Sequence, residues 1–272
     1  MTYWKAKFRG KLSGAIGKLL CTLLQRHVPE VSVKVVYERT NLVDELRNSL
    51  GEEVLITNSV ADLASNDLDL IVECAGHEAL GKLGPSVLAA GRDLLVASVG
   101  ALADHSLETL LIDAAATGGG RLRIPSGALG GLDALGAAKL AGLSQVRYES
   151  HKAPGAWRGT PAEEMVALDD VTQSTVVFEG TARDAARLFP KNANVTAAVA
   201  LAGVGFDRTS VVLHADPRAV GNTHRIKAEG DFGQIDVSVT GKTLPSNPKT
   251  SMLAPYSLVR AIANLNQTLV IA

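Results

Sequence analysis

Short apolar runs alternate with amphipathic helical stretches over the first 125 residues of the chain. Residues 68–73 are almost continuously apolar, which is typical of a parallel strand buried on both faces. The segments between such runs carry apolar residues at the 3.6-residue period of a helix with one buried face. Strands are expected at 31–37, 68–73, 94–97 and 121–125, and helices at 16–24, before Gly91 and at 106–116. This alternation predicts an α/β fold with a Rossmann-type doubly wound parallel sheet.

The pattern changes after Pro125. Several segments now alternate apolar and polar residues at period two, as the half-buried strands of an open sheet do. These segments are 146–149, 174–179, 210–215 and 234–240, and helical stretches lie at 130–142, 182–188 and 194–202. Thr181 followed by Asp184 resembles a capping box that opens the second of these helices. The sequence therefore predicts a second, α+β domain with an open mixed sheet.

The last helical segment, 252–265, is amphipathic, and we expect it to return to the first domain. The predicted organisation is a dinucleotide-binding domain at 1–125, with 252–272 packing back on it. A substrate and dimerisation domain is predicted at 126–251.

Charge and composition exclude several classes of function. The chain of 272 residues has 27 Lys and Arg against 28 Asp and Glu, so a nucleic-acid or membrane-surface partner is not expected. Two cysteines, Cys21 and Cys74, cannot make a disulfide framework, and no apolar run approaches the ~18 residues of a transmembrane helix. Motifs for metal hydrolysis, for a phosphate loop and for a serine hydrolase are missing. We expect a cytoplasmic protein with no metal site.

A glycine turn between the first predicted strand and helix points to a dinucleotide. A dinucleotide fold has G-x-G-x-x-G here, and Gly14 and Gly17 supply the second and third glycines, while Leu12 replaces the first. Glu38, at the end of the second strand, would bind the adenosine ribose, whereas Arg39 would suit a 2′-phosphate, so NAD and NADP both remain open. The alternatives are an ordinary strand–helix turn and a solvated strand end. The expected cofactor contacts in these segments are Gly14, Ala15, Ile16, Gly17, Glu38 and Arg39.

Six further motifs carry a family resemblance. They are E-C-A-G-H at 73–77, S-V-G-A-L at 98–102, P-S-G-A-L-G-G-L-D at 125–133, G-T-P-A-E at 159–163, F-P-K-N-A-N-V at 189–195 and N-P-K-T-S at 247–251. Together they resemble the L-aspartate dehydrogenase family. The resemblance extends from Gly14 over nearly the whole chain, and the P-K-N-A-N-V and N-P-K-T-S stretches are its most specific parts.

This resemblance implies an activity and some of its residues. The family oxidises L-aspartate to iminoaspartate by hydride transfer to NAD or NADP. The product hydrolyses to oxaloacetate and ammonia, or feeds quinolinate and NAD synthesis. By similarity, Ala128 and Asn194 contact the nicotinamide nucleotide, and His224 in N-T-H-R is the catalytic histidine. The family is typically a homodimer that pairs through the sheet of the second domain.

Further candidates follow from the chemistry of amine oxidation. The two substrate carboxylates need cations, and Lys191 and Lys249, with Thr250 beside it, are the best placed by sequence. His77 follows a parallel strand at the edge where such sheets bind ligands, and it is a candidate contact for substrate or nicotinamide. Ser98 ends the next strand, where small residues let the nicotinamide approach. For each residue the alternative is an ordinary solvated or structural side chain.

Two rival functions remain open at this point. One is another two-domain dehydrogenase or reductase, such as homoserine dehydrogenase or dihydrodipicolinate reductase. The other is a nucleotide-binding homologue without catalysis. The altered turn at Leu12 is the sequence feature that favours it.

The N-terminus does not fit a buried central strand. Lys5, Lys7, Arg9 and Lys11 stand at two-residue spacing and would all point to one side of a strand. We consider an edge position, a cap of solvated lysines over a shortened strand, and a divergent start region.

Overall fold

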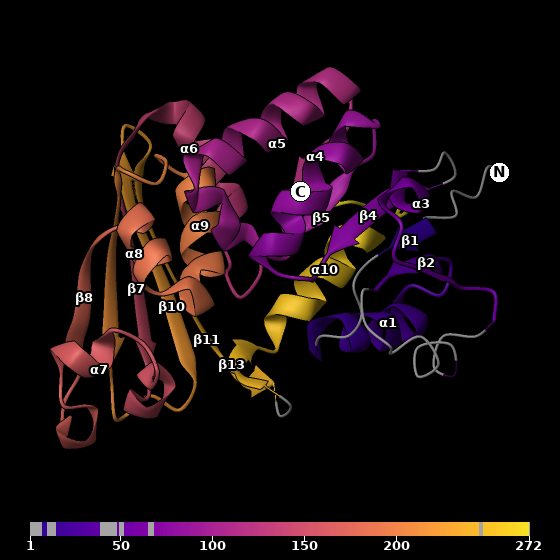
Figure 1. Cartoon of the computed structure of the whole chain (residues 1–272). Coiled ribbons are helices and arrows are strands. Elements are labelled where there is room, and N and C mark those ends of the chain that lie inside the picture. The colour runs from indigo at the N-terminus through magenta and orange to yellow at the C-terminus, as the bar shows by residue number, and fades with distance from the viewer. Residues whose placement is uncertain are drawn as a thin grey trace. The chain divides into compact units, whose positions relative to one another are not determined.

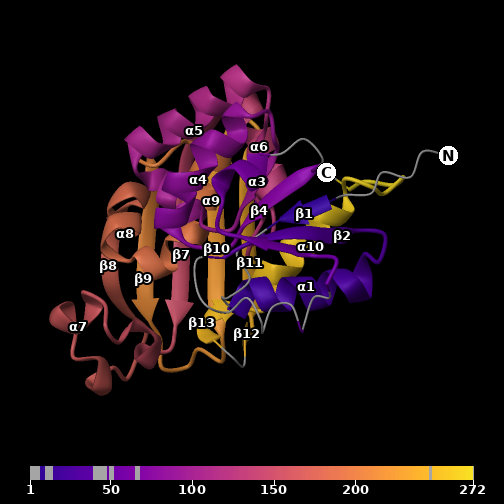
Figure 2. The same ribbon diagram turned by 45° about the vertical axis from the view of Figure 1, so that its right-hand side comes forward.

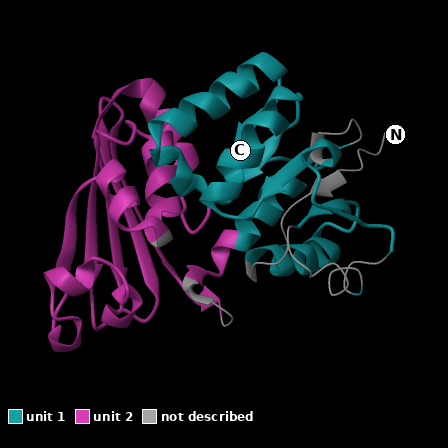
Figure 3. Ribbon diagram, viewed as in Figure 1, with its two compact units in different colours: residues 1–125, 255–272 teal, residues 126–254 magenta. Residues whose placement is uncertain are grey.

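The chain folds into two compact units. The computed structural model describes residues 7–9, 15–38, 48, 52–64, 68–244 and 247–271. Unit 1 comprises Met1–Pro125 and Pro255–Ala272, and unit 2 comprises Ser126–Ala254 (Figure 1, Figure 3).

Unit 1 is built on one parallel sheet. Its strands are β1 (Lys7–Arg9), β2 (Ser32–Tyr37), β3 (Leu55–Thr57), β4 (Leu70–Glu73), β5 (Leu94–Val96) and β6 (Leu122–Arg123). Their order is β3-β2-β1-β4-β5-β6, and every neighbouring pair is parallel. This is the order of a doubly wound dinucleotide fold, whose switch point lies between β1 and β4. The Rossmann-type sheet predicted from the sequence is confirmed.

The helices of unit 1 bury the two faces of this sheet. They are α1 (Ala15–His27), α3 (Val60–Ala64), α4 (His77–Ala89), the 3₁₀ helix η1 (Val99–Ala103), α5 (His105–Gly118) and α10 (Leu253–Ala263). Leu20 and Leu24 of α1 share one apolar core with Leu258 and Ile262 of α10. The two helices lie next to each other in both ribbon views (Figure 1, Figure 2). The predicted return of the last helix to the first unit is confirmed.

The first strand is central in the sheet. Phe8 pairs with Val33 of β2 on one side and with Leu70 of β4 on the other. An edge position for the basic N-terminal segment is therefore wrong. Lys5, Lys11 and the altered turn position Leu12 lie outside the described residues.

One strand of unit 1 was not expected. β3 is a three-residue edge strand that pairs with β2, and Leu55 in it is half exposed. Because so short an edge strand buries little apolar surface, it leaves no clear periodicity in the sequence.

Unit 2 contains a mixed five-stranded sheet. Its strands are β7 (Leu143–Lys152), β8 (Thr175–Thr181), β9 (Thr209–Ala215), β10 (Asn222–Gly230) and β11 (Gly233–Gly241), in the order β11-β10-β7-β9-β8. Only the β7–β9 pair is parallel. A separate hairpin joins β12 (Thr243–Leu244) and β13 (Asn247–Ser251). The predicted open mixed sheet is confirmed, but β10 was missed as a strand.

Helices of unit 2 cover one face of its sheet. The helices are α6 (Leu132–Gly142), α7 (Ala162–Met165), α8 (Ala182–Leu188) and α9 (Ala193–Ala202), with 3₁₀ turns η2 (Pro154–Trp157), η3 (Leu168–Asp170) and η4 (Pro190–Asn192). α8 begins with the predicted capping box, in which the Thr181 hydroxyl oxygen accepts the Asp184 backbone N–H at 3.1 Å. Among the described helices, none is long and apolar enough to cross a membrane.

A buried carboxylate joins two loops at the carboxyl edge of the first sheet. Glu73 ends β4 and is 8 % exposed. Its Oε1 accepts the backbone N–H groups of Ala75 at 2.5 Å and Gly76 at 2.8 Å. The Ser98 hydroxyl donates to Oε1, and the Ser98 backbone N–H donates to Oε2, both at 2.9 Å. Glu73 thus ties the loop after β4 to the loop after β5, at the edge where doubly wound sheets bind ligands.

We predict that Glu73→Gln destabilises unit 1. The amide NH₂ would face N–H donors that now bind a carboxylate, so about 2 kcal/mol of stability is lost and the thermal midpoint falls by roughly 5 °C. Glu30→Gln, at an exposed turn, is the matched control. Equal midpoints for the two variants in calorimetry would show that these hydrogen bonds do not stabilise the fold.

Candidate functional site

The carboxyl edge of the first sheet offers a place for a dinucleotide. Glu38 follows β2 directly and is buried, and its backbone N–H donates to the Thr57 carbonyl at 2.9 Å. α1 begins immediately beyond the glycine turn, and a helix start supplies N–H donors to a phosphate. A buried carboxylate at the end of the second strand is the group that binds ribose hydroxyls in this fold. These residues therefore fit the cofactor expected from the sequence.

The predicted cofactor contacts have different surroundings. Gly14 and Arg39 lie outside the described residues, and Ala15 opens α1. Ile16 is half-buried and Gly17 is buried. The remaining three are Ser98, which Glu73 holds, Ala128, which is buried, and Asn194, which is exposed in the first turn of α9.

A buried histidine lies on the inner face of the second sheet. His224 is on β10, opposite Ser150 of β7, and is 4 % exposed. Its Nδ1 lies 2.7 Å from the hydroxyl oxygen of Tyr148, which is two residues before Ser150 on the same face. The two rings are nearly parallel, at 15°, with centroids 6.1 Å apart. The tyrosine therefore holds both the position and the tilt of the imidazole.

Burial keeps this histidine neutral. Loss of hydration, with a smaller contribution from the charge of Lys152, lowers the pKa of His224 to about 3. Burial also raises the pKa of Tyr148 above its usual range, so its hydroxyl stays protonated. At neutral pH the pair is an uncharged imidazole hydrogen-bonded to an uncharged phenol.

A lysine completes this inner face. Lys152 is the last residue of β7, on the same face as Tyr148, and only 6 % of it is exposed. Its Nζ donates to Oδ1 of Asn192 and lies 5.3 Å from the ring centroid of Trp157. Burial lowers the pKa of Lys152 to about 8, so most of the group is still charged at neutral pH.

The structure brings together only part of the predicted substrate site. His224 is placed with Tyr148 and Lys152, two residues that the sequence analysis did not single out. His77 begins α4 in unit 1, and Thr250 lies half-buried on β13 in unit 2. The side chains of Lys191 and Lys249 lie outside those that the structure describes. Within the described part of the chain, no three His, Cys, Asp or Glu side chains are grouped to hold a metal ion.

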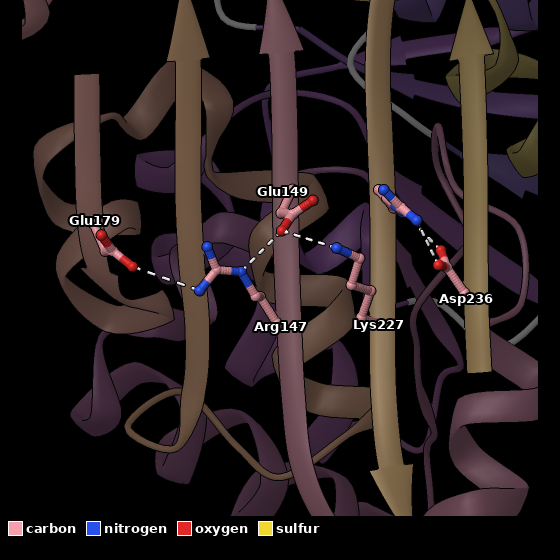
Figure 4. Close-up of polar contacts among 6 residues, drawn as sticks. Arg147, Glu149, Glu179, Lys227 and Asp236 are labelled. Atoms are coloured by element: carbon pink, nitrogen blue, oxygen red, sulfur yellow. Dashed lines mark hydrogen bonds and ion pairs between the residues drawn. The ribbon is translucent and has the colours of Figure 1, made fainter. Parts of the chain in front are cut away.

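The outer face of the second sheet is charged. Glu149 accepts hydrogen bonds from Arg147 at 2.9 Å and Lys227 at 3.4 Å, and Arg147 also reaches Glu179 at 3.5 Å (Figure 4). Asp236 on β11 pairs with Arg225 through two hydrogen bonds, of 2.7 and 2.5 Å. These residues stand out from the sheet on the side opposite to His224, because side chains alternate along a strand.

Comparisons with known proteins decide the family. L-aspartate dehydrogenase from Cupriavidus necator is 47 % identical over 251 residues, which is 92 % of this chain and 94 % of the relative. The Brucella anthropi enzyme of the same name is 44 % identical, over 95 % of this chain and 96 % of the relative. This chain belongs to the L-aspartate dehydrogenase family. The resemblance drawn from the sequence motifs is confirmed.

Family models and solved structures agree with this assignment. Residues 133–265 match the model described as aspartate dehydrogenase, C-terminal, and residues 13–125 match homoserine dehydrogenase, NAD binding domain. Aspartate dehydrogenase from Thermotoga maritima is similar over 98 % of this chain and 99 % of that one, at 25 % identity and a TM-score of 0.77. A reductoisomerase from Zymomonas mobilis, at 16 % identity and a TM-score of 0.59, shares the fold over 98 % of this chain and 72 % of its own. The C-terminal part is therefore the part of this chain whose family model names aspartate dehydrogenase.

We predict that His224 makes the protein acid-sensitive. The unfolded chain binds a proton at this histidine near pH 6.5, whereas the folded chain does so only near pH 3. Stability contributed by the neutral imidazole is therefore lost as pH falls below 6.5, by at most about 1.4 kcal/mol per pH unit. Urea unfolding between pH 7 and 5 measures the slope.

The slope should decrease in His224→Gln and persist in His105→Gln, whose side chain is 81 % exposed. An unchanged slope in His224→Gln would mean that this histidine titrates normally in the folded protein.

Proposed function

We propose that this chain oxidises L-aspartate to iminoaspartate, with NAD or NADP as cofactor and His224 as the base. The observation that carries the role of His224 is the position of its imidazole, which Tyr148 holds on the inner face of the second sheet. Amine oxidation needs a base for the amine proton, and a neutral imidazole can accept one. The iminoaspartate then hydrolyses to oxaloacetate and ammonia, or serves quinolinate and NAD synthesis.

The contact between Nδ1 of His224 and the Tyr148 hydroxyl fits either imidazole tautomer, and in our proposal the productive tautomer has its proton on Nδ1. When Nδ1–H donates to the phenol oxygen, Nε2 has a free lone pair. That nitrogen takes the proton of the substrate amine, or of the water that attacks the imine. Because the tyrosine and the sheet register fix the ring, the imidazole needs no reorientation before the proton moves.

The cofactor supplies the hydride chemistry, since the nicotinamide accepts the hydride from the substrate Cα. In our proposal Gly14, Ala15, Ile16 and Gly17 face the pyrophosphate, Glu38 or Arg39 the adenosine ribose, and Ser98, Ala128 and Asn194 the nicotinamide nucleotide. Lys191, Lys249 and Thr250 are proposed for the substrate carboxylates, and His77 for a substrate contact. We also propose that the protein works in the cytoplasm.

We predict that His224→Ala lowers kcat/KM for L-aspartate by about 10²–10⁴-fold, because a positioned base is lost. Binding of NAD or NADP, measured by calorimetry, should stay within twofold. His105→Ala removes an exposed histidine and should keep wild-type turnover. Wild-type turnover in His224→Ala would exclude the proposed role.

Two measurements separate the rival functions. Turnover of L-homoserine in place of L-aspartate would favour a homoserine dehydrogenase. Failure of wild-type protein to bind either nucleotide would favour a homologue without catalysis.

We further propose a homodimer that pairs through the outer face of the second sheet. This face carries both signs of charge in an ordered network, and the described helices α6, α8 and α9 lie on the other face. A two-fold pairing of such a face with itself can place cations against anions.

We predict that Lys227→Glu converts the dimer into a monomer, because the reversed charge stands beside Glu149 and faces the partner copy. Light scattering after size exclusion measures the mass. Lys139→Glu, at an exposed position of α6, should remain dimeric. A Lys227→Glu dimer as stable as wild type would place the interface elsewhere.

A further inference from the structure

Lys152 is a buried cation without a counter-ion in the described structure. No described carboxylate lies within ion-pair distance of Nζ, and its two contacts, Asn192 and Trp157, are neutral. An amide oxygen and an aromatic face stabilise an ammonium group, but they do not neutralise it. A charge buried in this way costs folding free energy unless an anion accompanies it.

The lysine shares one strand face with the proposed base. Tyr148, Ser150 and Lys152 occupy alternate positions of β7 and are all buried. His224 pairs with Ser150, the middle residue, so Tyr148 and Lys152 lie diagonally on either side of it. The charge of Lys152 also helps to lower the pKa of His224, as expected for two groups that lie close together.

A buried hydroxyl lies between the tyrosine and the lysine on this face. The Ser150 side chain is 1 % exposed, and its hydrogen bonding with Tyr148 acts to lower the pKa of that phenol. Buried hydroxyls are nearly always hydrogen-bonded, and here the neighbouring tyrosine provides the partner. The face offers a cation, a hydroxyl and an imidazole.

We propose that Lys152 binds one carboxylate of the substrate. This inference rests on the proposed function for the identity of the substrate, a dicarboxylic amino acid. It adds a cation that the sequence analysis missed to the two lysines predicted for the substrate carboxylates. Carboxylate binding would also neutralise Lys152 and so increase the basicity of His224 when substrate is present.

The test uses succinate, a dicarboxylate that has no amine and is not oxidised. Calorimetry on the full-length protein loaded with reduced cofactor measures its affinity. We expect Lys152→Met to weaken succinate binding about 100-fold or more, because the buried cation is lost. Affinity for the cofactor should stay within twofold. Lys139→Met, at an exposed helical position, is the matched control and should bind succinate as wild type does.

Stability distinguishes a ligand-binding lysine from a structural one. Because Lys152→Met replaces an unneutralised buried charge with an apolar chain of similar length, its thermal midpoint should equal or exceed that of wild type. Lys152→Arg keeps the charge and should retain more affinity than Lys152→Met. A lower midpoint together with unchanged succinate affinity would show that the lysine serves the fold alone.

The pH dependence gives a further readout. Succinate does not change its charge above pH 7, and Tyr148 and His224, the described titratable groups on the same face, stay neutral. Lys152 attracts the carboxylate only while it is protonated, so wild-type affinity should fall up to tenfold per pH unit above about pH 8. In Lys152→Arg the fall should be absent to pH 10, because arginine stays charged. Equal profiles for the two proteins would overturn the proposal.

The outcome is independent of the proposed activity. If wild type oxidises L-aspartate but Lys152→Met binds succinate normally, this inference fails and the proposed function stands. If wild type fails to oxidise L-aspartate, the proposed function fails, while loss of succinate binding in Lys152→Met still identifies a carboxylate site. The affinities of wild type and Lys152→Met for L-aspartate and for L-alanine, which has no side-chain carboxylate, tell which carboxylate Lys152 binds. If the variant binds only L-aspartate more weakly, Lys152 binds the side-chain carboxylate. If it binds both amino acids more weakly and to the same extent, Lys152 binds the α-carboxylate.

Discussion

The site depends on the hydrogen bond between Tyr148 and His224 across two antiparallel strands. Each residue is buried on the helix-covered face of the second sheet, where water cannot satisfy its polar group. The bond therefore holds the imidazole in place, and in the proposed mechanism its other nitrogen takes the proton of the substrate. Because the two strands are in fixed register, one backbone ladder sets the positions of the proposed base, the tyrosine and the lysine together.

Charged side chains are paired on one face of this sheet but not on the other. Outside, Arg147, Glu149 and Lys227 pair with each other and remain partly exposed. Inside, Lys152 has only neutral partners among the described residues, and His224 is held uncharged. A fold optimised for stability alone would not bury an unneutralised ammonium group. We therefore interpret the inner face as a site for an anion, as the proposed role of Lys152 requires.

Much of the fold could be predicted from the sequence, but less of the site. The parallel strands of unit 1 are apolar on both faces, so runs such as 68–73 identified them. β10 was missed because its inward positions include Asn222 and His224, which interrupt the apolar alternation. His224 was nominated by family resemblance alone. Lys152 could have been noticed by extending the alternation from Val146 to the end of β7, where a lysine occupies an apolar position, but the register with β10 is a tertiary property.

The most direct test of this account is a crystal structure of the protein with NAD(P)⁺ and succinate. The account predicts a succinate carboxylate within about 3 Å of the Lys152 ammonium, and His224 Nε2 facing the ligand carbon that corresponds to Cα of aspartate. A ligand bound away from the inner face of the second sheet, with His224 still enclosed and no anion at Lys152, would contradict it.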